Sequence, residues 1–151
     1  MYTLVRRYIK TAIGFLAFGL GIGGWMIARR ELYDVHPSSY VVSAHTHAIF
    51  VGFVMMMILG VALWLFPRPD REDTRYRPAR IEWAYWLLTI GTAGRVAGEL
   101  LRTASGARTL RAAILVFGAA QIVALLLFFH SMWSRIRPLG SRAREEKGER
   151  F

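Results

Sequence analysis

Two histidines, His45 and His47, lie at the start of a long apolar run that ends at Phe66 and Pro67. An ionisable residue within or at the edge of a membrane-spanning segment is costly to desolvate, so it is a functional-site hypothesis by default. Imidazole is a ligand of haem iron and of other transition metals. The chain has no cysteine, which excludes disulfides, thiolate metal sites and covalent c-type haem attachment. The pattern therefore predicts a haem or metal site at His45 and His47.

Helix geometry limits how these histidines act together. Residues two apart on a regular helix point about 200° from each other, so both cannot bind one metal. Either one is the ligand while the other faces a subunit contact or supports the ligand, or the first turn is not helical. Met26, at the end of the preceding apolar run, is a candidate second axial ligand because its thioether binds haem iron.

Arg95 and Glu99 lie four residues apart, and therefore on one face of a predicted helix. Arg95 is a candidate for binding a haem propionate or another anion. The alternative is an intrahelical pair, with the histidines hydrogen-bonded between helices. His36 lies in the loop before the second apolar run and could approach the site at His45 and His47. Gln121 lies in an apolar run and requires a hydrogen-bond partner on another helix.

Two other groups of possible ligands favour structural roles. Thioethers suit Cu(I), but the consecutive residues 55–57, all methionine, spread around a helix and indicate packing. His130 closes the last apolar run and is predicted to lie on the opposite side of the membrane from His45, as an interfacial cation near a helix end.

The composition indicates a membrane protein with charged ends. Of 151 residues, 54% are hydrophobic and 20% are charged. Four apolar runs, about 11–28, 41–66, 81–101 and 110–132, predict an all-α, integral membrane four-helix bundle formed by residues 1–133. The first run lacks a signal-peptide cleavage pattern, so it is expected to be retained. Residues 134–151 are expected to form a charged, frayed cytoplasmic tail.

The net charge of +10 indicates anionic lipid headgroups as partners, not nucleic acid, because the basic residues lie between apolar runs. The positive-inside rule predicts both termini in the cytoplasm, in the inner cell membrane. The basic residues on the predicted cytoplasmic side are Arg6, Arg7, Lys10, Arg68, Arg71, Arg75, Arg77, Arg80, Arg135, Arg137, Arg142, Arg144, Lys147 and Arg150. Those on the outer side are Arg29, Arg30, Arg102, Arg108 and Arg111. His45 and His47 then lie within about 10 Å of the outer boundary, at about 1.5 Å per residue, with Met26, Arg95 and Glu99 at a similar depth.

The second apolar run resembles helix II of the catalytic subunit of haem-copper oxidases and nitric oxide reductases. The resemblance is carried by Ala44-His45-Thr46-His47, Gly52, Gly60 and Leu65-Phe66-Pro67, and covers about the first 70 residues. It is also similar to short four-helix relatives with His-x-His at this place. In the family a histidine early in this helix is an axial ligand of low-spin haem b. Counting back from Pro67 fits His45 and His47 equally well.

The resemblance implies one b-type haem near the outer face, with His45 or His47 as axial ligand. Met26, a second chain's histidine or a small ligand would fill the sixth position, and the protein would transfer electrons or bind a diatomic gas. The family's other haem and copper ligands lie on later helices, so a complete oxidase or reductase is not expected from one chain. Expected partners are a second copy or respiratory-complex subunits. The alternative is a cofactor-free accessory or assembly subunit; a copper or proton channel using Arg95 and Glu99 is a weaker third.

Overall fold

The computed structural model describes residues 2–67, 76–136 and 148, and in these ranges every regular element is helical. Helix α1 spans Tyr2–Tyr33. The second helical rod has three consecutive parts: α2 (Ser39–Thr46), the π-helix η1 (His47–Met55) and α3 (Met56–Leu65). Helices α4 (Pro78–Arg102) and α5 (Arg108–Met132) follow, and the short η2 (Trp133–Arg135) ends the described bundle. The all-helical prediction is therefore confirmed.

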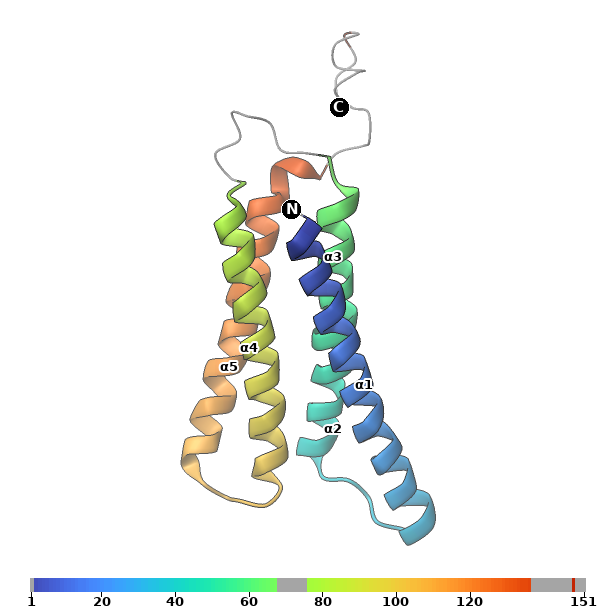
Figure 1. The fold of residues 1–151 in the computed structure, drawn as a ribbon. Helices are drawn as coiled ribbons and strands as arrows, with labels where there is room; N and C mark the ends of the chain where they lie inside the picture. The colour runs from blue at the N-terminus through green and yellow to red at the C-terminus, as the bar shows by residue number, and fades with distance from the viewer. Residues whose placement is uncertain (1, 68–75, 137–147, 149–151) are drawn as a thin grey trace.

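The helices form two hairpins that lie side by side (Figure 1). One hairpin consists of α1 and the α2–η1–α3 rod, and the other of α4 and α5. The N-terminus and η2 lie at one end, which we call the terminal end. The loops 34–38 and 103–107 lie at the other, which we call the loop end, and there α1 diverges from α4 while α2 stays in contact with α4.

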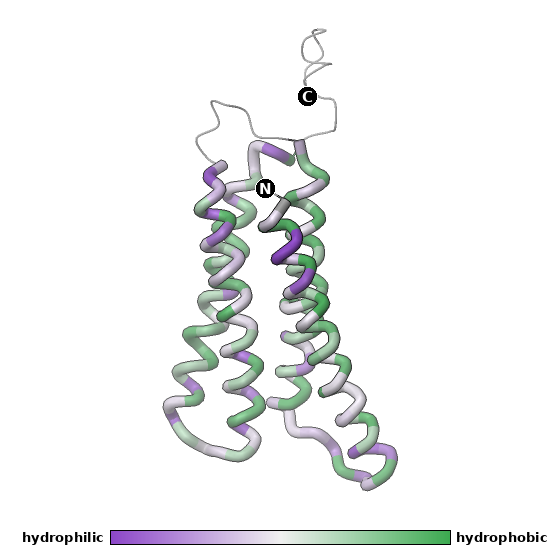
Figure 2. The backbone as a smooth tube through the Cα atoms, viewed as in Figure 1, coloured by the Kyte–Doolittle hydropathy of each residue, from purple (hydrophilic) through white to green (hydrophobic). Residues whose placement is uncertain are grey.

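Three described helical stretches are long and apolar enough to cross a membrane: Thr3–Tyr33, Ser39–Leu65 and Arg108–Arg135. Many of their large apolar side chains are exposed, and apolar residues cover much of the length of the rods (Figure 2). An apolar surface of this extent requires lipid around it. The protein is thus a multi-pass membrane protein.

Helix α4 is not among these three stretches, and two of its charged residues, Arg95 and Glu99, lie away from its ends. It is long enough to cross a bilayer, which takes about 20 residues. Its membrane insertion, predicted for 81–101, stays a prediction, as does the cytoplasmic location of both termini. The predicted tail 134–151 falls outside the described residues except for 134–136 and 148, and the basic loop between α3 and α4 is described only from Tyr76 onward.

The core of the bundle lies toward the terminal end, where all four rods contribute side chains. Tyr8 is fully buried, and its ring packs edge-on against the rings of Tyr85 and Phe128, with centroids 5.1 and 6.0 Å away. The Thr11 and Tyr85 hydroxyls are 2.8 Å apart and link α1 to α4. These contacts join the two hairpins across their facing surfaces.

A buried arginine closes the terminal end. Arg135 is only 1% exposed, and its guanidinium donates to three backbone carbonyls at the end of α3. The distances are 2.7 Å from Nε to Pro67 O, 2.9 Å from Nη2 to Phe66 O and 3.3 Å from Nη2 to Leu63 O. The guanidinium also lies 4.9 Å from the centre of the Tyr76 ring. Because the last carbonyls of a helix have no partner within the helix, Arg135 acts as the cap of α3.

At the loop end, α1 stops at a residue in the left-handed conformation. Asp34 has φ 52°, and its backbone N–H donates to Arg30 O at 3.1 Å, while that of Val35 donates to Arg29 O at 3.1 Å. Aspartate tolerates this conformation better than most non-glycine residues. The turn directs the following residues, His36 and Pro37, back toward α2.

Replacing Asp34 tests this turn. We expect Asp34→Val to lower the free energy of unfolding by about 1–2 kcal/mol, because a β-branched residue is strained at positive φ. Asp34→Gly, which removes the strain, retains wild-type stability or exceeds it. Denaturation in detergent, followed by circular dichroism, measures both. Equal stability of the valine and glycine variants would contradict the assigned turn.

Candidate functional site

The helical period changes at the histidines. Helix α2 ends at Thr46, and the π-helix η1 begins at His47 and continues for nine residues. A π-helix has i→i+5 hydrogen bonds, occurs mostly as short insertions in α-helices, and is frequent at functional sites. The first turn is therefore helical, but the rod is not a regular α-helix through both histidines.

His45 faces α1. Its Nδ1 lies 2.9 Å from the backbone oxygen of Gly19, which only accepts hydrogen bonds, so Nδ1 carries a proton and in the neutral ring Nε2 carries the lone pair. A Cβ at Gly23 would lie 2.9 Å from Cε1 of His45, so a larger residue there would displace the imidazole. Histidines that bind metals typically donate their other N–H to a carbonyl or carboxylate in this way. No hydrogen bond to Nε2 of His45 occurs among the described residues.

The His45 side chain lines a cavity of about 430 Å³ at the loop end, which we call the His45 pocket. Its other lining residues are Gly23, Met26, Ile27, Arg30, His36, Pro37 and Val42. The volume lies within the range of small-molecule sites, about 300–1,000 Å³. The structure thus brings together His45, Met26 and His36, all candidates from the sequence.

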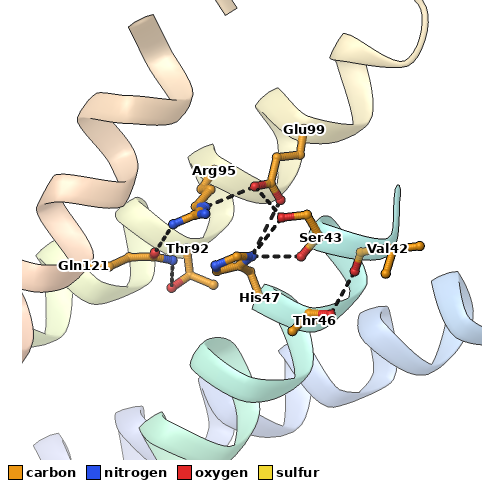
Figure 3. A network of polar contacts seen from close by, with 8 residues as sticks. All are labelled: Val42, Ser43, Thr46, His47, Thr92, Arg95, Glu99 and Gln121. Carbon is orange, nitrogen blue, oxygen red and sulfur yellow. Dashed lines mark hydrogen bonds and ion pairs between the residues drawn. The ribbon is translucent and has the colours of Figure 1, made fainter. Parts of the chain in front are cut away.

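His47 faces the opposite side, toward α4 (Figure 3). Its Nδ1 donates to the backbone oxygen of Ser43 at 2.8 Å and lies 3.7 Å from Oε2 of Glu99. The prediction that the two histidines point in different directions is confirmed. They do not share one site.

Glu99 is the centre of a polar cluster between the hairpins, which we call the Glu99 cluster (Figure 3). It consists of Ser43, His47, Thr92, Arg95, Glu99 and Gln121. Glu99 is 3% exposed, and its Oε1 accepts hydrogen bonds from Ser43 Oγ at 2.8 Å and from Arg95 Nε at 3.1 Å. Its Oε2 has no hydrogen-bond partner among the described residues.

Gln121 extends the cluster to α5. Its Oε1 accepts from Nη1 of Arg95 at 3.4 Å, and its Nε2 donates to Oγ1 of Thr92 at 3.1 Å. The predicted partner on another helix is therefore present. Arg95, a candidate for an anion or propionate, lies in this cluster and does not line the His45 pocket. Ser43 and Thr92 were missed in the sequence because single hydroxyl residues are common in apolar helices.

The remaining candidates lie elsewhere. His130 is exposed in the last turn of α5, next to η2 at the terminal end, whereas the His45 pocket lies at the loop end. Met56 is fully buried in the core, and Met55 and Met57 pack against it, as the packing interpretation requires. Among the described residues no group of three or more His, Cys, Asp or Glu side chains is placed to hold a metal ion.

The fold defines an all-helical, multi-pass membrane protein with an imidazole pocket at one end and a buried ionic cluster beside it. The chain belongs to the family of cytochrome c and quinol oxidase polypeptide I, which it matches over residues 3–100. The matched region includes nearly all of α4 and is longer than the first 70 residues on which the resemblance was based. The family implies a respiratory-complex context. No curated protein and no solved structure matches the chain.

Proposed function

We propose that the protein binds one b-type haem in the His45 pocket, with His45 as an axial ligand, and that it transfers electrons or binds a diatomic gas. Members of the family bind haem. The observation that carries the proposal is the hydrogen bond from His45 Nδ1 to Gly19 O at 2.9 Å. It fixes the tautomer whose Nε2 lone pair binds a metal, and it orients the ring.

The other residues of the pocket fit the same group. Met26 supplies a thioether for the sixth position, and histidine–methionine ligation is one of the arrangements used for haem iron. Arg30 supplies a guanidinium for a propionate carboxylate. Ile27 and Val42 provide apolar surface that excludes water. A bound haem would supply reversible one-electron chemistry, or an open iron coordination site if Met26 does not bind.

Optical spectra of the detergent-purified protein, oxidised and then reduced with dithionite, test the proposal. We expect sharp reduced bands in the wild type and in His47→Ala, and their loss in His45→Ala. Retention of the bands in His45→Ala with loss in His47→Ala would reassign the ligand to the Glu99 cluster. Carbon monoxide that shifts the reduced spectrum would indicate gas binding, and no shift would indicate electron transfer with a filled sixth position.

A cofactor-free accessory or assembly subunit is the second candidate. It is favoured by the Glu99 cluster, in which His47 and Arg95 are hydrogen-bonded by protein groups alone. A colourless wild type from haem-replete cells would support this alternative. The proposal also includes an inner-membrane location, both termini in the cytoplasm, and assembly with a second copy or with respiratory subunits, for which the distribution of basic residues and the family are the support.

A further inference from the structure

We propose that Glu99 is a positioning residue for His45, acting from α4 through Ser43 and the helical turn 43–47. This inference rests on the proposed role of His45 as a haem ligand. Glu99 lies on the other hairpin and does not line the His45 pocket. It acts by fixing the rotation of the turn that carries the imidazole.

The turn is held from two sides. On the α1 side, His45 is bonded to Gly19 O at 2.9 Å. On the α4 side, Ser43 Oγ donates to Glu99 Oε1 at 2.8 Å, and the Ser43 carbonyl accepts from His47 Nδ1 at 2.8 Å. Ser43 and His47 are therefore joined into one polar edge facing Glu99, while His45 points the other way.

Backbone hydrogen bonds from the His47 N–H to the Ser43 and Ala44 carbonyls hold the turn together, so contacts with α1 and α4 determine how the turn as a whole is rotated. Apolar contacts contribute: Ala44, Ala48 and Val96 form a small buried cluster between the rod and α4. Alanine and valine side chains pack without directional preference, however, whereas a hydrogen bond to a buried carboxylate is directional and strong. The Ser43–Glu99 hydrogen bond is therefore the directional contact that sets the angle of the turn on the α4 side.

Glu99 is held in place for this role. Arg95 Nε donates to the same oxygen, Oε1, at 3.1 Å, and Arg95 is in turn bonded to Gln121 of α5. The carboxylate thus has a fixed position relative to the second hairpin. Because Glu99 fixes the turn 43–47 relative to the second hairpin, the direction in which Nε2 of His45 points depends on the hydrogen bond between Ser43 and Glu99.

Histidine nitrogen NMR of the haem-free, ¹⁵N-histidine-labelled protein tests the inference without depending on haem binding. At about pH 8, above the ordinary histidine pKa of about 6.5, neutral rings report their tautomer directly. We expect His45 to populate only the Nδ1–H tautomer in the wild type. Glu99→Ala and Ser43→Ala should both give a mixture of tautomers, because the ring loses its fixed approach to Gly19 O.

Two variants serve as controls. Glu99→Gln keeps an oxygen that accepts from Ser43 and Arg95, so it should restore the single tautomer. Glu82→Gln changes a carboxylate on the same helix whose partner is Arg7, 2.9 Å away at the exposed terminal end, and should have no effect. If Glu99→Ala fails to fold, Ser43→Ala decides the outcome, because it removes only the hydroxyl. An unchanged His45 tautomer in folded Ser43→Ala would overturn the inference.

The haem-loaded protein gives a second readout. We expect the electron paramagnetic resonance g-values of the oxidised haem to shift in Glu99→Ala and Ser43→Ala, and to be restored in Glu99→Gln. A wild type that binds no haem would refute the proposed function, while the tautomer measurement would still decide whether Glu99 positions His45. A haem protein with identical g-values and tautomers in all four variants would refute the positioning role alone.

Discussion

Arg135→Ala lowers the free energy of unfolding by about 3 kcal/mol, because hydrogen bonds to a charged group contribute about 1.5–3 kcal/mol each and several are lost together. The substitution leaves the carbonyls of Leu63 and Phe66 without their guanidinium partner at the end of α3. It also removes the contact between the guanidinium and the Tyr76 ring. The terminal end of the bundle loses the group that joins α3 to η2.

Denaturant titration in detergent, followed by circular dichroism, measures this loss. Arg135→Lys should recover only part of the stability, because an ammonium group cannot reproduce the planar fork that reaches Leu63, Phe66 and Pro67. Arg108→Ala is the matched control, since Arg108 is exposed at the start of α5. An Arg135→Ala midpoint equal to that of Arg108→Ala would show that the cap contributes nothing.

Gly52→Val is expected to destabilise the protein by more than about 3 kcal/mol, at the upper end of the range for overpacked cores. A Cβ at Gly52 would overlap Cγ of Phe15 and would lie 2.7 Å from Cβ of the same residue. The Phe15 Cβ is fixed to the backbone of α1, so the ring cannot simply rotate away. Helix α1 must move from η1, and the His45–Gly19 hydrogen bond is expected to be lost as well.

A glycine on α1 provides the control for this substitution. Gly14→Ala should leave the fold intact and retain or raise stability, because no atom lies within 4 Å of the added Cβ and alanine is favoured over glycine in a helix. Thermal unfolding and haem retention, measured on the same samples, distinguish the two sites. A Gly52→Val protein with wild-type stability would contradict the close packing of α1 on η1.

The number of helices and their approximate bounds follow from the apolar runs, but hydropathy underestimates their length. The first run, predicted at 11–28, forms α1 over Tyr2–Tyr33. The extra turns contain Arg6, Arg7 and Arg29, which lower the hydropathy without stopping a helix. Helix formation depends on backbone hydrogen bonds and propensity, and arginine is a good helix former.

The sequence indicated most of the candidate functional side chains, but not which of them lie together in the structure. His45 and His47 stand out because imidazoles are rare in apolar runs, and their opposite directions follow from helical geometry. The π-helix was not predicted from the sequence, since no residue type in His47–Met55 distinguishes i→i+5 from i→i+4 hydrogen bonding. Likewise, nothing in the spacing of Ser43 and Glu99 shows that they meet, because they are 56 residues apart and on different hairpins.

The Arg135 cap has a consequence for biosynthesis. Leu63 and Arg135 are 72 residues apart in the chain. At a translation rate of about 5–20 residues per second, Arg135 is synthesised several seconds after the C-terminal end of α3. The first hairpin must therefore form without its cap, and the terminal end closes only when the last described helix has been synthesised. In a nascent chain that stops before Arg135, the last carbonyls of α3 would have no guanidinium partner. The cap can therefore form only after both hairpins have been synthesised.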